Sequence, residues 1–109
     1  MATDLAGAWL NRATLRGASL SHSNLRKAQG RECDAQGAAF CAAMLDRSEF
    51  ERADFRHADL SKARFGSTTL SGADLRNADL RGQAQQLLDG AELQRWFADH
   101  GAPLVEVRQ

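Results

Sequence analysis

A period of five residues governs the first 82 positions of the chain. Every leucine and phenylalanine in this stretch lies at a multiple of five, and only Gly30 and Ala35 interrupt the series. The position two residues earlier is small in every unit, from Thr3 to Ala78. Neither a helix nor a flat strand brings residues five apart onto one face. The pattern therefore predicts a backbone that turns a corner every five residues, with one large and one small side chain of each unit pointing to a common axis.

The units also have a specific consensus. Residues 73–82 read Ala-Asp-Leu-Arg-Asn followed by Ala-Asp-Leu-Arg-Gly, and residues 53–55 and 58–60 match the same opening. This motif resembles the A(D/N)LXX unit of the pentapeptide-repeat family, over about residues 3–82. The resemblance implies an all-β solenoid, namely a right-handed quadrilateral β-helix of about four coils with four units in each coil. Residue n then stacks on residue n+20.

That stacking places the two interruptions beneath two large aromatic side chains. Gly30 would lie under Phe50, and Ala35 under Phe55. We interpret this arrangement as volume compensation, because an unfilled space in a core costs stability. The alternative is a kink or a ligand pocket in the second coil.

The period fails after the repeats, so we divide the chain into a repeat domain, 1–82, and a C-terminal capping helix and tail, 83–109. Asp89 and Glu92 have the spacing of a helical capping box. The helix could cover Leu75 and Leu80 in the last coil, or it could make a homodimer contact. Three apolar residues would share its contact face: Leu93, Trp96 and Phe97.

The other end of the solenoid has no predicted cover. The repeat begins within three residues of Met1, and an open coil with unpaired strand edges invites association. A partner protein, a second copy or an upstream domain could cover it. Trp9 occupies an outward register near this end, where it could mark a contact site or fold over the first coil.

The outward charges sort by face when residues twenty apart are stacked. The first face leans basic, through Arg26, Lys27, Arg47 and Arg64. On the third face an acidic ladder lies beside arginines, either as a self-neutralising surface or as an interaction strip. Together with Trp9, the expected partner-binding residues on that strip are Arg16, Asp54, Arg56, Asp74 and Arg76.

Composition and motifs give no sign of catalysis. The chain has 14 basic and 14 acidic residues, so no global field draws it to nucleic acid or to an anionic membrane. There is no P-loop, no GxGxxG and no CxxC motif. We expect no enzymatic activity, no cofactor and no metal. Without a signal peptide or an apolar run long enough to span a membrane, a cytoplasmic location is expected.

Two functions fit these features best. The leading one is a non-enzymatic scaffold or adaptor that presents rigid faces to another protein. The rival comes from the resemblance, since known family members mimic DNA and modulate DNA gyrase or related topoisomerases, protecting them from quinolones or toxins. A duplex mimic requires net negative charge, whereas residues 3–82 hold 12 basic and 10 acidic residues. We therefore favour the scaffold, and we expect no direct binding of nucleic acid. A purely structural module of a larger assembly is a further alternative.

Overall fold

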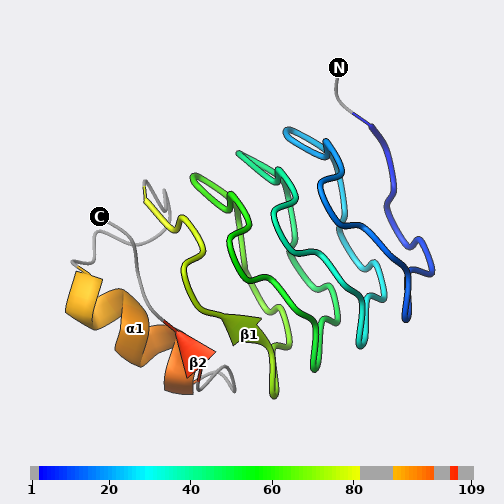
Figure 1. Ribbon diagram of the computed structural model, residues 1–109. Coiled ribbons are helices and arrows are strands. Elements are labelled where there is room, and N and C mark those ends of the chain that lie inside the picture. Colours follow the sequence, from blue (N-terminus) through cyan, green and yellow to red (C-terminus); the bar gives the residue numbers. More distant parts are fainter. Residues whose placement is uncertain (1–2, 82–89, 100–103, 106–109) are drawn as a thin grey trace.

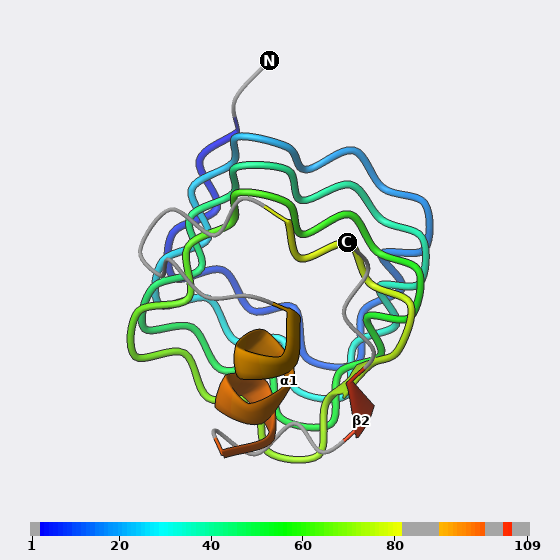
Figure 2. The ribbon, with the colours of Figure 1, turned by 90° about the vertical axis from the view of Figure 1, so that its left-hand side faces the viewer.

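The repeats wind into a solenoid that α1 and β2 close at one end. The computed structural model describes residues 3–81, 90–99 and 104–105. The turns of residues 3–81 stack along one axis, with the N-terminal turn at one end and α1 (Gly90–Asp99) at the other (Figure 1). Seen from the C-terminal end, the turns superpose around that axis and α1 lies across the end of the stack (Figure 2). We refer to residues 3–22, 23–42, 43–62 and 63–81 as the first to fourth turns.

Parallel backbone pairing between neighbouring turns holds the stack together. Each bridge joins residues twenty positions apart, from Asp4 with Asn24 to Asp59 with Asp79. The interval expected from the sequence is therefore the one that the backbone adopts. The same pairing continues beyond the repeats, because β1 (Asp74–Leu75) pairs in parallel with β2 (Leu104–Val105). Strand β2 thus adds one further rung to the fourth turn.

Each corner is a tight turn with one residue in the left-handed region. The N–H of Ala8, for example, donates to the carbonyl of Leu5 at 2.9 Å, and the same bond recurs along the chain. The second residue of every corner, from Gly7 to Asn77, has a φ between 58° and 72°. Eleven of these fifteen residues are not glycine. Because a left-handed residue with a Cβ costs about 1–2 kcal/mol, these corners hold strain that the stacked turns must offset.

The left-handed corner geometry predicts that glycine is favoured over residues with a Cβ at the second corner position. Ser67 is exposed with a φ of 59°, so Ser67→Gly should raise the free energy of unfolding by up to about 1 kcal/mol. Gly37 has a φ of 67° and open space where a Cβ would lie, so Gly37→Ala should lower it by about 1 kcal/mol. Urea denaturation measures both. The exposed Ser71 lies outside the left-handed region, and an equal gain from Ser71→Gly would contradict this account.

Large and small inward side chains fill the centre of the solenoid. The inward positions from Ser23 to Leu80 are buried. The rings of Phe40, Phe50 and Phe55 meet edge to face, with centroids 5.7 Å and 5.3 Å from that of Phe55. A methyl group at Gly30 would overlap the ring of Phe50. The missing side chain at Gly30 therefore makes room for an aromatic one, as volume compensation predicted, and the ring fills the space that a ligand pocket would need.

This close approach predicts a coupling between the two positions. Gly30→Ala should destabilise the chain by about 1–3 kcal/mol, because the buried ring of Phe50 has to shift. In a Phe50→Leu background, where the ring is absent, the same substitution should cost clearly less. Unfolding free energies of the four members of this double-mutant cycle provide the measurement. Additive losses would show that the two positions do not compete for space.

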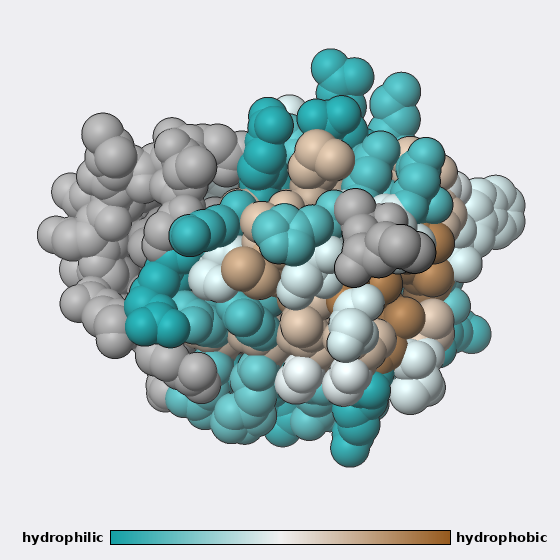
Figure 3. Space-filling view, turned by 90° about the horizontal axis from the view of Figure 1, so that it is seen from above, coloured by the Kyte–Doolittle hydropathy of each residue, from teal (hydrophilic) through white to brown (hydrophobic). Residues whose placement is uncertain are grey.

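The two ends of the solenoid differ. Phe97 of α1 is 1% exposed and packs edge to face on Phe65 of the fourth turn, with centroids 5.3 Å apart. The inward leucines of the first turn, from Leu5 to Leu20, remain partly exposed, and hydrophobic surface shows toward that end of the molecule (Figure 3). No helix within the described residues is both long and apolar enough to cross a membrane. The expected capping-box residue Asp89, and the side chains of Glu92 and Leu93, lie outside the described residues.

Candidate interaction surfaces

The recurring aspartate of the repeat caps the corner that follows it. Asp54 Oδ1 accepts the backbone N–H of Arg56 at 3.1 Å, and Asp74 Oδ1 accepts that of Arg76 at the same distance. A short polar side chain that accepts the N–H two residues ahead is a common turn device. The same contact occurs at Asp4, Asn24, Asp34, Asp59 and Asp79. The consensus Asp or Asn therefore has a folding role in this chain.

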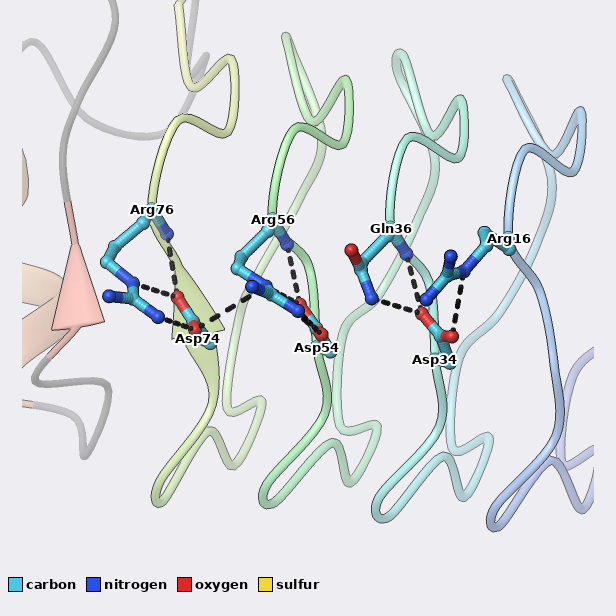
Figure 4. A network of polar contacts seen from close by, with 7 residues as sticks. All are labelled: Arg16, Asp34, Gln36, Asp54, Arg56, Asp74 and Arg76. Atoms are coloured by element: carbon cyan, nitrogen blue, oxygen red, sulfur yellow. Dashed lines mark hydrogen bonds and ion pairs between the residues drawn. The ribbon is translucent and has the colours of Figure 1, made fainter.

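Arginines neutralise the acidic ladder of the third face. The Arg56 guanidinium donates to both carboxylate oxygens of Asp54, at 3.0 and 2.9 Å, and its Nε lies 3.8 Å from Asp74 (Figure 4). Arg76 donates to both oxygens of Asp74 at 3.0 and 2.7 Å. Two-point pairing of this kind is strong and directional. Most of the negative charge of the ladder is therefore neutralised within the ladder itself.

In the second turn the ladder continues with a different pair. Asp34 Oδ2 accepts a hydrogen bond of 3.0 Å from Nε of Arg16, which lies in the first turn. Gln36 replaces the local arginine and donates to Asp34 through its backbone N–H and its amide, both at 3.2 Å. Four predicted partner-binding residues are therefore joined by ion pairs, and the fifth, Arg16, pairs separately with Asp34 on the same face: the four are Asp54, Arg56, Asp74 and Arg76.

These contacts shift ionisation in the directions that pairing predicts. Hydrogen bonds from the Arg76 guanidinium hold the pKa of Asp74 below its usual value, against the effect of burial. Burial opposes ionisation of Asp34, yet the Gln36 N–H and Arg16 outweigh it, and the pKa of Asp34 is lowered. The hydrogen bonds and charge of Asp54 raise the pKa of Arg56. Asp34, Arg56 and Asp74 are therefore charged and paired at neutral pH.

A pH dependence follows for Asp74. Its pKa is lower in the folded than in the unfolded chain, so its contribution is complete above the unfolded value of about 3.9 and is lost as pH falls through the folded value. Asp74→Asn keeps an oxygen to cap the corner but loses the ion pair. We expect the free energy of unfolding of the Asp74→Asn variant to be about 0.5–1 kcal/mol lower than that of the unmodified chain at pH 7, and this difference should disappear toward pH 2. Urea unfolding at both pH values measures it.

Asp4→Asn is the matched control for that substitution. Asp4 also caps a corner, with its carboxylate accepting the N–H of Ala6 at 3.1 Å, but it makes no ion pair within the described residues. The stability of the Asp4→Asn variant should change little at pH 7. A deficit of the Asp74→Asn variant that persists unchanged at pH 2 would show that the ion pair is not its source.

The charged side chains of the second face, which carries Arg31, Glu49 and Glu51, also form ion pairs. Arg31 donates to Glu49 at 2.9 Å and to Glu51 at 3.3 Å, and Thr69 donates to Glu51 at 2.8 Å. Burial disfavours the charged form of Glu51, but these donors outweigh it and lower its pKa. On the fourth face Arg81 donates to both oxygens of Asp79, at 2.9 and 2.7 Å. Most of the outward charge on these faces is neutralised locally.

The corner between the first and second faces, at residues 26–27 and 46–47, is different. Four residues line a shallow hollow there, which we call the basic hollow: Arg26, Lys27, Asp46 and Arg47. Its three cations make no ion pair within the described residues, whereas Asp46 pairs with Arg64 at 3.4 Å. The second oxygen of Asp46, Oδ1, is buried and accepts no hydrogen bond there. The basic bias of this face is visible in the sequence, whereas the hollow depends on the fold.

The remaining predicted residues lie apart from the third-face network. Trp9 is 80% exposed on the first turn, so it does not fold over the open coil. Phe97 is buried against Phe65, and Trp96 is half-buried with its ring 4.9 Å from that of Phe97. The homodimer contact through α1 stays a prediction, in which Phe97 would reach a partner only if α1 left the solenoid.

Reactive side chains are scattered or shielded. The described residues contain no cluster of three or more His, Cys, Asp or Glu side chains that could hold a metal ion. Cys33 is a buried free thiol, and burial together with Asp34 raises its pKa to about 12. Such a thiol acts as a small apolar filler. Cys41 is also free and is half-buried.

Comparison with known families agrees with the repeat. Residues 1–29, 31–61 and 48–82 match the family model of pentapeptide repeats, with eight copies. The chain belongs to the pentapeptide-repeat family. No curated protein matches it in sequence.

Solved structures with a related fold include several pentapeptide-repeat proteins. One from the Arabidopsis thaliana thylakoid lumen is 23% identical, over 92% of this chain and 79% of that one, with a TM-score of 0.45. HetL of the cyanobacterium Nostoc, involved in the regulation of heterocyst differentiation, is 29% identical over 72% of this chain, with a TM-score of 0.37. QnrB1, a plasmid-mediated fluoroquinolone resistance protein, is 20% identical over 96% of this chain, with a TM-score of 0.29. This chain spans 40% of HetL and 64% of QnrB1.

Proposed function

We propose that this chain is a non-enzymatic interaction scaffold or adaptor that binds another protein. In this proposal a right-handed, four-sided solenoid of about four coils, closed by the C-terminal helix, presents flat faces to the partner. The observation that carries it is the internal use of polar groups. Asp54, Asp74 and Asp79 each cap a corner and pair with an arginine, and within the described residues these three do not converge on a pocket.

Rigidity supports a binding role. Backbone bonds between turns hold each exposed side chain at a fixed rung, about 4.8 Å from the next. A surface that is already ordered loses little conformational entropy when a partner binds. A near-flat scaffold of this kind suits recognition of a protein better than enclosure of a small molecule, which requires a concave apolar site.

The charge arrangement argues against the DNA-mimic alternative. A mimic has to present unpaired negative charge to a basic groove, whereas the carboxylates of Asp54 and Asp74 each pair with a bidentate arginine. The whole chain has a formal net charge of zero. The free thiols of Cys33 and Cys41 are compatible with the reducing cytoplasm, where we propose that the chain acts.

The scaffold proposal predicts how the purified chain behaves in two assays. Immobilised chain should retain a specific protein from extracts of its native cell, and the purified partner should then bind it directly in a saturable manner. The chain should not strongly inhibit supercoiling of plasmid DNA by gyrase, nor protect gyrase from quinolones, at low micromolar concentration. Potent inhibition of gyrase would instead support the alternative function, a modulator of DNA gyrase.

The third-face ladder supplies a matched pair of variants for locating the partner. Arg56→Glu with Arg76→Glu reverses charge on that face only, while Arg52→Glu with Lys62→Glu makes the same change in net charge at exposed corners. Weaker capture by the first variant alone would place the partner on the third face. Unchanged capture by it would move the partner to another surface.

A further inference from the structure

We propose that the basic hollow and Trp9 together bind an acidic segment of the partner protein, with an apolar side chain of that segment on Trp9. This inference rests on the proposed scaffold function and adds a surface and a partner chemistry to it. It follows from unpaired charge, the shape of the corner, its rigidity and the position of one exposed aromatic residue.

Unpaired charge is concentrated at this corner. Elsewhere on the faces, Arg31, Arg56 and Arg81 contact carboxylates at 3.3 Å or less. Arg12 and Arg52 reach Glu32 at 3.9 Å, and Lys62, which makes no ion pair within the described residues, lies alone on another corner. Within the described residues, Arg26, Lys27 and Arg47 make no ion pair, and they gather around one hollow. In a chain with no net charge, this is a local positive field that an anionic partner can complete.

The shape of the corner comes from its neighbours in the stack. The residues that stack on Arg26 and Lys27 from the first turn are Ala6 and Gly7, and Gly66 and Ser67 follow in the fourth turn. Small side chains therefore flank the long basic ones on both sides, and Arg26, Lys27 and Arg47 are exposed.

Backbone bonds fix the position of the hollow. Gly7 N–H donates to the carbonyl of Arg26 at 2.8 Å, Lys27 N–H to that of Asp46 at 3.1 Å, and Arg47 N–H to that of Gly66 at 2.7 Å. The cations are therefore carried on adjacent rungs that cannot slide past one another. The backbone that carries these cations is already ordered. Binding therefore avoids the loss of backbone conformational entropy that most weakens binding by a flexible basic segment.

Trp9 provides an apolar contact beside these cations. Its backbone pairs with that of Gln29, two residues beyond Lys27, so it lies at the start of the face next to the hollow. Its side chain is 80% exposed, and it is the one large hydrophobic side chain with that exposure among the described residues. Tryptophan and arginine are the residue types that most often dominate protein interfaces. Their combination favours an acidic peptide that also carries an apolar residue.

The same features disfavour a nucleic acid. Affinity for a duplex grows with the number of phosphates contacted, and the hollow offers three cations on two adjacent turns. The carboxylate of Asp46 lies among them and repels any anion, so the hollow suits a short acidic segment with few charges better than a long phosphate backbone.

Fluorescence anisotropy with a defined peptide tests the proposal. The probe is fluorescein-labelled Glu-Asp-Glu-Phe-Glu-Asp at about 0.15 M ionic strength, where the Debye length is about 8 Å, titrated with the full chain. Arg26→Glu, Lys27→Glu and Arg47→Glu together should weaken binding at least tenfold, and Trp9→Ala about fivefold. The charge-matched control is Arg52→Glu with Lys62→Glu and Arg95→Glu, which should weaken binding less than threefold because distant surface charges are screened.

Glutamate is acceptable at the corner, since Glu32 occupies the same register with a φ of 58°. If far-UV circular dichroism nevertheless shows that the variant is misfolded, the double variant Lys27→Asn with Arg47→Asn replaces it. Asparagine is chosen because Asn77 occupies the equivalent corner position, also with a positive φ. These two neutral substitutions should still weaken peptide binding several-fold.

Three results would overturn the inference. Equal losses in the hollow and control variants would mean that only net charge matters. Tighter binding of a 20-base-pair DNA duplex than of the peptide would make the hollow a nucleic-acid site. If the chain captured its protein partner but did not bind the peptide, the hollow would not be the binding site and the scaffold function would still stand. If the unmodified chain captured no partner at all, the scaffold function itself would be wrong.

Discussion

The backbone hydrogen bonds between residues twenty apart are the constraint on which the rest of this structure depends. They require every fifth residue to return to the same radial position, so the chain must turn a corner at each unit, and the second corner residue must enter the left-handed region. Once the corners are fixed, the large and small inward residues alternate around the axis and exclude water from it. Core, corners and faces are therefore one cooperative arrangement, as expected for a solenoid.

The surface charges divide into those that help the chain to fold and those that do not. Asp54 and Asp74 have two tasks, since each caps a corner and each holds an arginine. These groups have little capacity left for another molecule. Lys27 and Arg47 have neither task in the described structure, and they sit where small residues flank them. The surfaces thus differ more in the charge that is left unpaired than in the number of charges on each face.

Much of the fold could be predicted from the sequence because one short-range pattern repeats many times. The spacing of five located the buried Phe50 and Phe55, and the resemblance supplied the interval of twenty. The left-handed corners were not foreseen, since residues such as Arg47 are not typical of that conformation. The pairing of β2 with β1 and the contact of Phe97 with Phe65 depend on how a non-repetitive segment folds back. Likewise, the hollow depends on which side chains find partners, which face assignment alone does not decide.

The return of the backbone after twenty residues also restricts how a gene for such a chain can change length. An insertion or deletion of one unit of five would rotate all later residues by one side, so Phe50 would no longer lie over Gly30 and Arg76 would join a different face. A change of twenty residues would keep every later side chain on its own side and in its own stack. The faces of this solenoid can therefore be lengthened by whole turns while every stack is kept, whereas shorter steps exchange one face for another.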